Sequence, residues 1–183
     1  MEFDVIRSKR KTFAAEIKQN RLLIRAPQWA SDAEIDAFVR QHKHWIETHL
    51  AKAQARQKAA ETCPKLTDAD IQALTAQAKL LIPARVNYYA PLVGVSYGRI
   101  TIRHQRTRWG SCNGKGDLNF NCLLMLAPPE VLDSVVVHEL CHRKEMNHSD
   151  KFYAEVLRVF PDYGHCHKWL KENGRLLMAR LGE

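Results

Sequence analysis

The chain has 183 residues, of which 45% are hydrophobic, 26% charged and 8% aromatic, which is typical of a globular protein with enough apolar side chains for a core. No apolar run approaches the roughly 20 residues that a membrane-spanning helix needs, so a membrane protein is excluded. The N-terminal residues lack the apolar stretch of a signal peptide, and we expect a cytoplasmic location.

The five cysteines form no CxxC pair, and their odd number argues against a disulfide framework and fits a reducing compartment. The net charge is 28 − 20 = +8. The stretch 71–116 contains no acidic residue but seven basic ones: Lys79, Arg85, Arg99, Arg103, Arg106, Arg108 and Lys115. This stretch would attract a nucleic acid or another anionic partner, or form a solvated basic surface, and no RNA- or DNA-reading motif accompanies it.

The N-terminal third predicts a hairpin followed by a helix. Strands are expected over Thr12–Ile17 and Leu22–Arg25, with a turn near Gln19 and Asn20. Ser31 and Glu34 form a capping box, after which apolar residues recur at helical spacing as far as Leu50. The polar, alanine-rich stretch 51–64 is interpreted as a fraying helix end that leads into a connector.

The remainder predicts helices around two strands. A helix capped by Thr67 and Asp70 is expected to be disturbed at Pro83. Strands Arg99–Arg103 and Leu118–Leu123 enclose a turn-rich segment. Helices are then expected over Pro129–Glu145, Ser149–Phe160 and His165–Leu181, and the first of these is apolar nearly all round, which indicates burial.

The buried helix contains an HExxH motif, His138-Glu139-Leu140-Cys141-His142. Residues four apart share one face of a helix, so the two histidines can bind one metal ion. Glu139 lies about 100° further round, where its carboxylate can take a proton from a metal-bound water. Zinc lowers the pKa of such a water to about 7, so the motif indicates metal-assisted hydrolysis.

A third ligand is expected at His148, six residues after His142, because this spacing is that of metzincin-type sites. Those sites have a glycine where this chain has Glu145, and Asn147 is expected to supply part of the left-handed turn. The alternative third ligand is a carboxylate from a following helix, either Glu155 or Asp162.

Other residues near the motif have weaker signals. Arg108 is a candidate to stabilise an oxyanion or bind a substrate carboxylate or phosphate, and Tyr163 is a second candidate stabiliser. Trp109 and Gly110 are interpreted mainly as the wall of a cleft. His165 and His167 diverge by about 200° on a helix, so both are interpreted as surface or packing residues.

Several segments together resemble the YgjP-like, or SprT-like, metallopeptidase family. The matching pieces are Arg108–Cys112, the strand that leads to Pro128, the HELCH sequence, and Asn147–Ser149 followed by Phe152. The resemblance covers at least Arg99–Tyr163.

The resemblance implies a zincin-like α+β fold, in which a small twisted, mainly antiparallel sheet packs on the buried HExxH helix and a backing helix. It implies an N-terminal hairpin and helix over residues 1–60 and a hydrolase domain over 64–183. It also implies one zinc ion on His138, His142 and His148, with Glu139 as the base. The strand Leu118–Leu123 would edge the cleft, so Asn119 and Asn121 join the candidates for substrate binding listed above: Arg108, Trp109 and Tyr163.

Three functions remain open from the sequence. The leading one is a zinc metallopeptidase that acts on polypeptides. The second is a metal-dependent hydrolase of nucleotide phosphoanhydrides, for which the basic stretch is the reason. The third is a basic nucleic-acid-associated protein with a structural metal, in which Cys141 is the most plausible fourth ligand.

Overall fold

The computed structural model describes residues 2–18 and 20–182, and the chain divides into two compact units, Met1–Thr62 and Cys63–Glu183. The class is α+β, with two small mixed sheets and six α-helices among the described residues. None of the helices in the described residues has the length and apolar character needed to cross a membrane.

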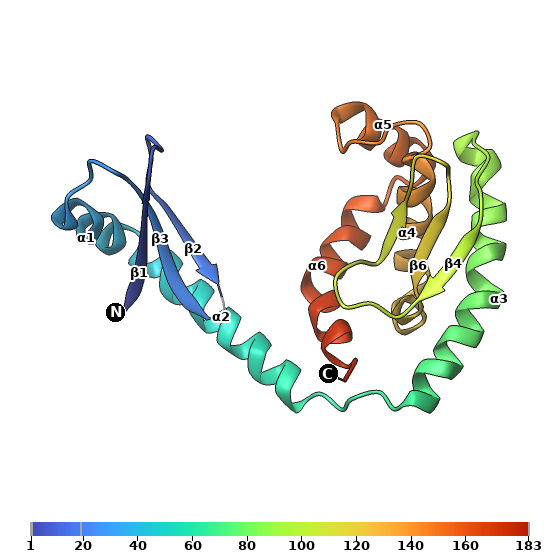
Figure 1. Ribbon diagram of the computed structural model, residues 1–183, viewed down its shortest axis with the longest axis horizontal. Coiled ribbons are helices and arrows are strands. Elements are labelled where there is room, and N and C mark those ends of the chain that lie inside the picture. Colours follow the sequence, from blue (N-terminus) through green and yellow to red (C-terminus); the bar gives the residue numbers. More distant parts are fainter. Residues whose placement is uncertain (1, 19, 183) are drawn as a thin grey trace. The chain divides into compact units, whose positions relative to one another are not determined.

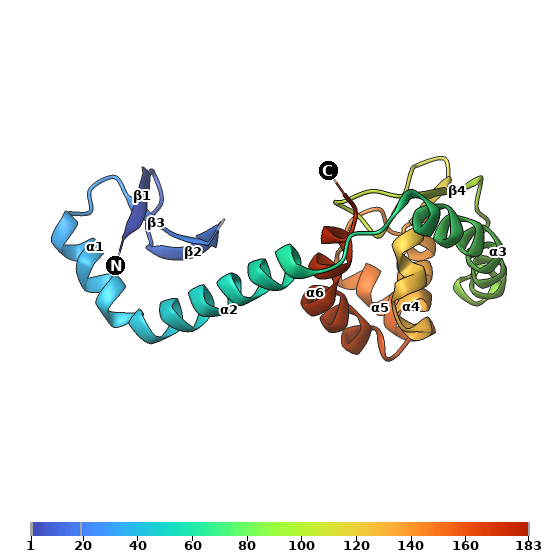
Figure 2. The same cartoon turned by 90° about the horizontal axis from the view of Figure 1, so that it is seen from below.

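The first unit is a three-stranded sheet packed on two helices (Figure 2). Its strands are β1 (Phe3–Ser8), β2 (Ala14–Lys18) and β3 (Arg21–Pro27), in the order β1-β3-β2. The predicted hairpin corresponds to β2 and β3; Gln19 of its turn lies outside the described residues, and Asn20 has a φ of 61°. Strand β1, which pairs parallel to β3, was not predicted because it is mostly exposed and shows no alternation of buried and exposed residues.

The predicted capping box of Ser31 and Glu34 is confirmed at the start of α1 (Asp32–Gln41). The predicted single helix is divided at His42, and α2 (Lys43–Thr62) extends through the stretch that was interpreted as a fraying end. Alanine, glutamine and lysine are strong helix formers, which accounts for the longer helix. The core of this unit consists of apolar residues from β3, the turn after it, α1 and α2: Leu22, Ile24, Ala26, Ala30, Ile35, Val39 and Ile46.

The second unit begins with α3 (Asp68–Val93), which is capped by Thr67 and Asp70 as predicted. The helix continues through Pro83 and Pro91, so the expected disturbance at Pro83 is wrong. Burial of one face compensates for the hydrogen bonds that proline removes, since Ala78, Ile82 and Val86 have no exposed surface.

The sheet of this unit contains β4 (Ile100–Arg103), β5 (Gly110–Cys112) and β6 (Leu118–Asn121), in the order β4-β6-β5. The expectation of a mainly antiparallel sheet is wrong, because β6 is antiparallel to β5 but parallel to β4. A short turn joins β5 to β6 and forces them antiparallel, and β6 then enters between β5 and β4.

The strand expected at the edge of the cleft is therefore the central strand of the sheet. Leu118 and Phe120 of β6 are fully buried, and β5 is the edge strand that lies beside α4. The Leu118–Leu123 prediction ran past the end of β6, because residues Cys122–Leu126 form a 3₁₀ helix.

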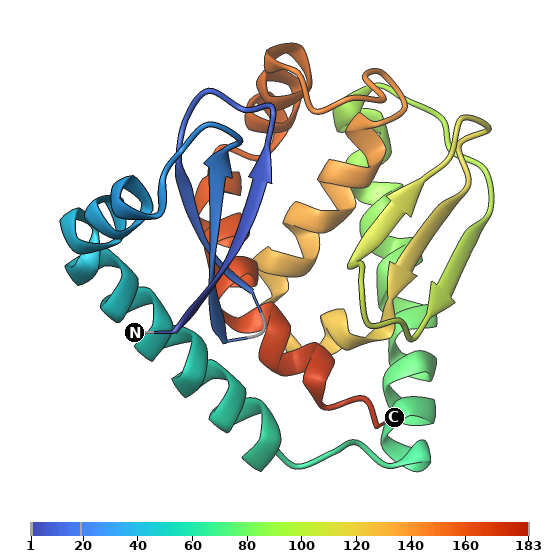
Figure 3. The same cartoon turned by 60° about the vertical axis from the view of Figure 1, so that its left-hand side comes forward.

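Helix α4 (Pro129–Cys141) lies between α3 and α6 (Tyr163–Ala179), as Figures 1 and 3 show, and α5 (Asp150–Val159) packs near its C-terminal end. The predicted burial of α4 is confirmed: ten of its thirteen residues are buried. Packing on several sides fixes the helix that carries the HExxH motif.

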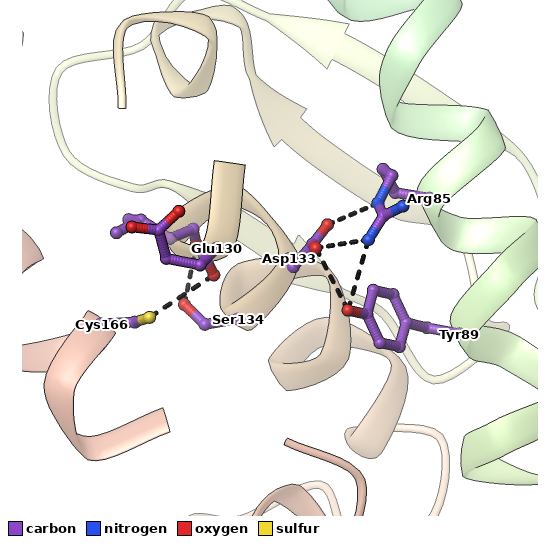
Figure 4. Close-up of polar contacts among 7 residues, drawn as sticks. Arg85, Tyr89, Glu130, Asp133, Ser134 and Cys166 are labelled. Carbon is purple, nitrogen blue, oxygen red and sulfur yellow. Dashed lines mark hydrogen bonds and ion pairs between the residues drawn. The ribbon is translucent and has the colours of Figure 1, made fainter. Parts of the chain in front are cut away.

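An ion pair between α3 and α4 adds a polar anchor to this packing (Figure 4). The Arg85 Nε donates to the Asp133 Oδ1 at 2.6 Å, and the Tyr89 hydroxyl donates to the other carboxylate oxygen at 3.1 Å. Asp133 is 8% exposed, so its charge depends on these partners. The network holds α4 one and a half turns before His138.

Candidate metal centre and its cavity

The two histidines of the HExxH motif lie one turn apart at the C-terminal end of α4. His138 is in the last turn, His142 follows the helix as its C-cap, and His148 stands immediately before Ser149. The Ser149 hydroxyl accepts a hydrogen bond from the Phe152 backbone N–H at 3.4 Å and so caps α5. This cap fixes the backbone directly after His148.

The chain turns between His142 and His148 without a left-handed residue. The Lys144 and Glu145 backbone N–H groups both donate to the Cys141 carbonyl, at 3.0 Å each, which extends the helical turn. The expectation that Asn147 adopts a left-handed conformation is wrong, because Asn20 is the only non-glycine residue with positive φ within residues 2–18 and 20–182. Neither a glycine at position 145 nor a left-handed asparagine is needed for this path.

The three histidine side chains converge. The Nε2 atom of His138 lies 3.2 Å from that of His142 and 3.0 Å from that of His148, and one ring nitrogen of each residue lies within 4.8 Å of the other two. The Phe152 ring packs against all three imidazoles at centroid distances of 4.6 to 4.9 Å. A single apolar ring thus supports the whole group.

Hydrogen bonds on the other ring nitrogens orient two of these imidazoles. The His142 Nδ1 donates to the Glu145 carbonyl at 3.0 Å, and the His138 Nδ1 lies 2.8 Å from the Tyr163 hydroxyl. A carbonyl only accepts, so His142 carries its proton on Nδ1 and presents the Nε2 lone pair to the other histidines. Such partners orient metal-ligating histidines in general.

The residues fit a zinc ion. Tetrahedral ligands at 2.0–2.1 Å from zinc lie about 3.3 Å from one another, close to the observed separations of 3.0 and 3.2 Å. Burial and the neighbouring imidazoles lower the pKa of His138 to about 3, and burial also lowers the pKa of His142. Both rings are therefore neutral near pH 7, as metal ligands must be.

Glu139 points from α4 toward the edge strand β5. It is 5% exposed, and burial raises the pKa of its carboxyl to about 8, an effect that the positive charge of Arg108 opposes. A Cβ atom at Gly110 would lie 2.5 Å from the Glu139 Oε1 and 2.7 Å from its Cγ. The absence of a side chain at position 110 therefore makes the room that Glu139 occupies.

A cavity of about 280 Å³ opens beside Glu139 and His138. Three of the residues predicted to bind substrate line it: Arg108, Trp109 and Tyr163. The remaining lining residues come from the loop before β5, from β5 itself, from α4 and from α6: Thr107, Gly110, Ser134, Val135, His167 and Leu170. His167 and Leu170 were not predicted here, although their spacing of four and seven residues from Tyr163 places all three on one face of α6.

The two asparagines predicted to bind substrate lie elsewhere. Asn121 is completely buried; its side chain donates to the Gln105 and Arg108 carbonyls at 2.6 and 3.0 Å and accepts from the Leu123 N–H at 3.1 Å. Its observed role is to hold the loop that carries Arg108. Asn119 is half-buried and bonds to the Ser111 hydroxyl at 3.3 Å.

The residues considered as alternative ligands lie outside the group of three converging histidines. Glu155 pairs with Lys144 at 3.2 Å and with Arg158 at 2.9 Å, and Asp162 is the N-cap residue of α6. Cys141 is fully buried and is not among the three residues that converge, and burial raises the pKa of its thiol to about 11. The geometry of the described residues therefore favours His148 over these groups.

A group of three histidines at the C-terminal end of a buried helix and in the segment that follows it, beside a glutamate and a cavity, defines a candidate metal-dependent hydrolase on an α+β scaffold. The family model of the YgjP-like metallopeptidase domain matches residues 11–69 and 60–173, so the chain belongs to the YgjP-like metallopeptidase family. A comparison with curated proteins found no match.

Two solved structures resemble part of the chain. The metallopeptidase zymogen of Pyrococcus abyssi abylysin is 20% identical with a TM-score of 0.47, over 52% of this chain and 97% of that one. The metallopeptidase zymogen of Methanocaldococcus jannaschii jannalysin is 21% identical with a TM-score of 0.45, over 50% of this chain and 95% of that one. The family membership rests on the family-model match, which suggests a polypeptide substrate and gives no support for a nucleic-acid partner.

Proposed function

We propose that residues 64–183 form a zincin-like, HExxH-type metallopeptidase domain that hydrolyses peptide bonds with one zinc ion per chain. His138, His142 and His148 would hold the ion, and Glu139 is the general base. The observation that carries the proposal is the convergence of the three Nε2 atoms beside a buried glutamate. Membership of a metallopeptidase family supports the peptide bond as the target.

When bound, the ion supplies Lewis acidity that polarises water and a substrate carbonyl. The chain's own residues perform the proton transfers. Glu139 acts in its ionised form, which the positive charge of Arg108 favours and a bound cation would favour further. The carboxylate accepts a proton from the attacking water and delivers it to the leaving nitrogen. Gly110 leaves the space that this carboxylate occupies, and only 5% of Glu139 is exposed.

The polypeptide substrate binds along the edge strand β5 in this proposal. The Trp109 carbonyl and the Asn113 N–H bond to residues 121 and 117, so residues 109, 111 and 113 direct their backbone groups toward β6. The intervening residues, Gly110 and Cys112, direct theirs toward the open edge. An extended peptide that pairs with these groups lies beside Glu139.

Nucleotide phosphoanhydrides are the second candidate substrates. Arg103, Arg106 and Arg108 are all exposed on the segment from the end of β4 to the start of β5, and Arg108 lines the cavity. Guanidinium groups in such a position suit phosphate oxygens. The exposed arginines are equally suited to an acidic segment of a polypeptide.

One assay separates these functions. Zinc-loaded protein is incubated with a library of quenched fluorescent peptides and, in parallel, with nucleoside triphosphates. We expect cleavage of peptides and a loss of at least about 100-fold in Glu139→Gln, with its metal content unchanged. Hydrolysis of triphosphates alone would contradict the peptidase function and support nucleotide hydrolysis. An active Glu139→Gln variant would show that Glu139 is not the general base.

A further inference from the structure

One face of α6 forms a wall of the cavity beside Glu139. Tyr163, His167 and Leu170 line the cavity at spacings of four and three residues, and Gly174 continues the same stripe four residues later. Trp109 belongs to the opposite wall, and the indole ring reaches across to α6 at Gly174.

The contact between Gly174 and Trp109 is close. A Cβ atom at position 174 would lie 3.0 Å from the Trp109 Cζ2 and 3.1 Å from its Nε1. Gly174 is buried in the middle of a helix, where glycine is about 1 kcal/mol less favourable than alanine. The missing side chain leaves a recess on α6 in which the indole lies, and a Cβ there would require the ring to move by a few tenths of an ångström.

The cavity offers an apolar interior with a basic opening. Trp109, Val135 and Leu170 are its apolar surfaces, and two of its hydroxyl groups already have partners: the Ser134 Oγ donates to the Val131 carbonyl at 2.8 Å, and the Tyr163 Oη lies 2.8 Å from the His138 Nδ1. Arg108 and His167 are exposed side chains of the lining. Glu139 is the only acidic residue among the lining residues.

We propose that this cavity is the specificity pocket of the enzyme and receives a large, uncharged apolar side chain of the substrate, such as leucine, methionine or phenylalanine, next to the bond that is cut. Gly174 sets the depth of the pocket through Trp109. Lysine and arginine side chains are rejected, because Arg108 repels them and the carboxylate of Glu139 is engaged in catalysis. The inference rests on the proposed peptidase function.

Peptide binding to zinc-loaded Glu139→Gln protein tests the pocket without turnover. Blocked tetrapeptides that differ at one residue, with leucine, phenylalanine, alanine or lysine there, are titrated by calorimetry. We expect the leucine and phenylalanine peptides to bind at least about 10-fold more tightly than the alanine and lysine peptides, which corresponds to about 1.4 kcal/mol. Equal affinities, or no binding of any of the four, would overturn the proposal.

Substitutions on α6 test the role of Gly174. In the same background, Gly174→Ala is expected to weaken binding of the phenylalanine peptide at least about 5-fold and to leave the alanine peptide unchanged, since the indole moves a few tenths of an ångström toward the pocket and a large aromatic ring no longer fits beside it. Gly164→Ala on the same helix is the matched control, because its Cβ would meet no heavy atom within 4 Å. Leu170→Phe, which fills the pocket from the same helix, serves if Gly174→Ala does not fold. An unchanged peptide preference in the folded variant would show that α6 does not determine which side chain the pocket accepts.

The two proposals fail in different ways. Selective binding by the Glu139→Gln protein, together with no peptide cleavage by the parent protein, would contradict the peptidase function and retain the pocket. Peptide cleavage without any preference for apolar residues would retain the peptidase and contradict the pocket.

Discussion

The Nδ1 atom of His138 lies 2.8 Å from the hydroxyl oxygen of Tyr163, which is on a different helix, 25 residues further along the chain. The contact makes Tyr163 an orienting partner of a candidate metal ligand, a role different from the substrate binding predicted from the sequence. Tyr163 is 8% exposed, and burial raises the pKa of its hydroxyl, so the group is neutral and available as a hydrogen-bond partner.

Loss of this hydroxyl should weaken metal binding. We expect Tyr163→Phe to reduce the affinity for zinc about 10- to 100-fold, because the His138 ring loses the partner that fixes its orientation. Competition with a chromophoric chelator measures the affinity directly. Tyr153→Phe, on α5 near the same histidines, is the control and should bind zinc like the parent protein. Equal affinities in the two variants would show that Tyr163 has only a packing role.

Removal of the third histidine should abolish the stabilisation that zinc provides. A ligand that binds only the folded state stabilises it by about 4.1 kcal/mol when the ligand is present at 1,000 times its Kd, and this stabilisation raises the melting temperature. Zinc should therefore raise the melting temperature of the parent protein and of His165→Ala, an exposed histidine of α6, but not that of His148→Ala. Chelator treatment should reverse the effect. An undiminished zinc response in His148→Ala would require a different third ligand.

A substitution at Gly110 tests the placement of Glu139, the proposed general base, beside the edge strand β5. We expect Gly110→Ala to lower peptidase activity about 100-fold, because the new methyl group would occupy the space of the Glu139 carboxylate, and small misplacements of a catalytic group have effects of this size. Metal content should be unchanged. Gly114→Ala, whose Cβ would meet no heavy atom within 4 Å, should retain full activity. Full activity in Gly110→Ala would contradict this placement of Glu139.

Local patterns in the sequence predicted the elements that depend on local physics. The HExxH spacing, the apolar character of α4 and the caps at Ser31 and Thr67 involve residues within a few positions of one another. Each is present where it was predicted. The same holds for the convergence of His138, His142 and His148, which are only ten residues apart.

Relationships over long sequence separations were not predictable from those patterns. Strand β6 is central because the chain returns after β5 and enters between β5 and β4. The alternation of apolar and polar residues along one strand does not indicate which strands pair with it. Asn121 was predicted to bind substrate, but its side chain donates to carbonyls 13 and 16 residues away. The place of His167 in the cavity depends on the packing of α6 against α4, which the sequence of α6 alone does not reveal.

Replacement of Arg85 should destabilise the protein more than replacement of its ion-pair partner Asp133. The Arg85 side chain is 34% exposed and the Asp133 side chain 12% exposed. In Asp133→Leu the arginine can still reach water, whereas in Arg85→Leu a buried carboxylate keeps only Tyr89 as a partner. Loss of one partner of a fully buried pair costs about 3–5 kcal/mol. We expect about 2 kcal/mol for Arg85→Leu and less for Asp133→Leu, because the pair is partly hydrated.

Urea unfolding of both single variants and of the double variant measures this asymmetry. The double variant should be more stable than Arg85→Leu alone, since it leaves no unpaired buried charge. A double variant as unstable as the sum of the two single changes would show that each residue contributes by packing and not by their pairing. The ion pair also matters for the metal site, because Asp133 is on α4, five residues before His138. Loss of the ion pair in Arg85→Leu should therefore also lower the affinity for zinc.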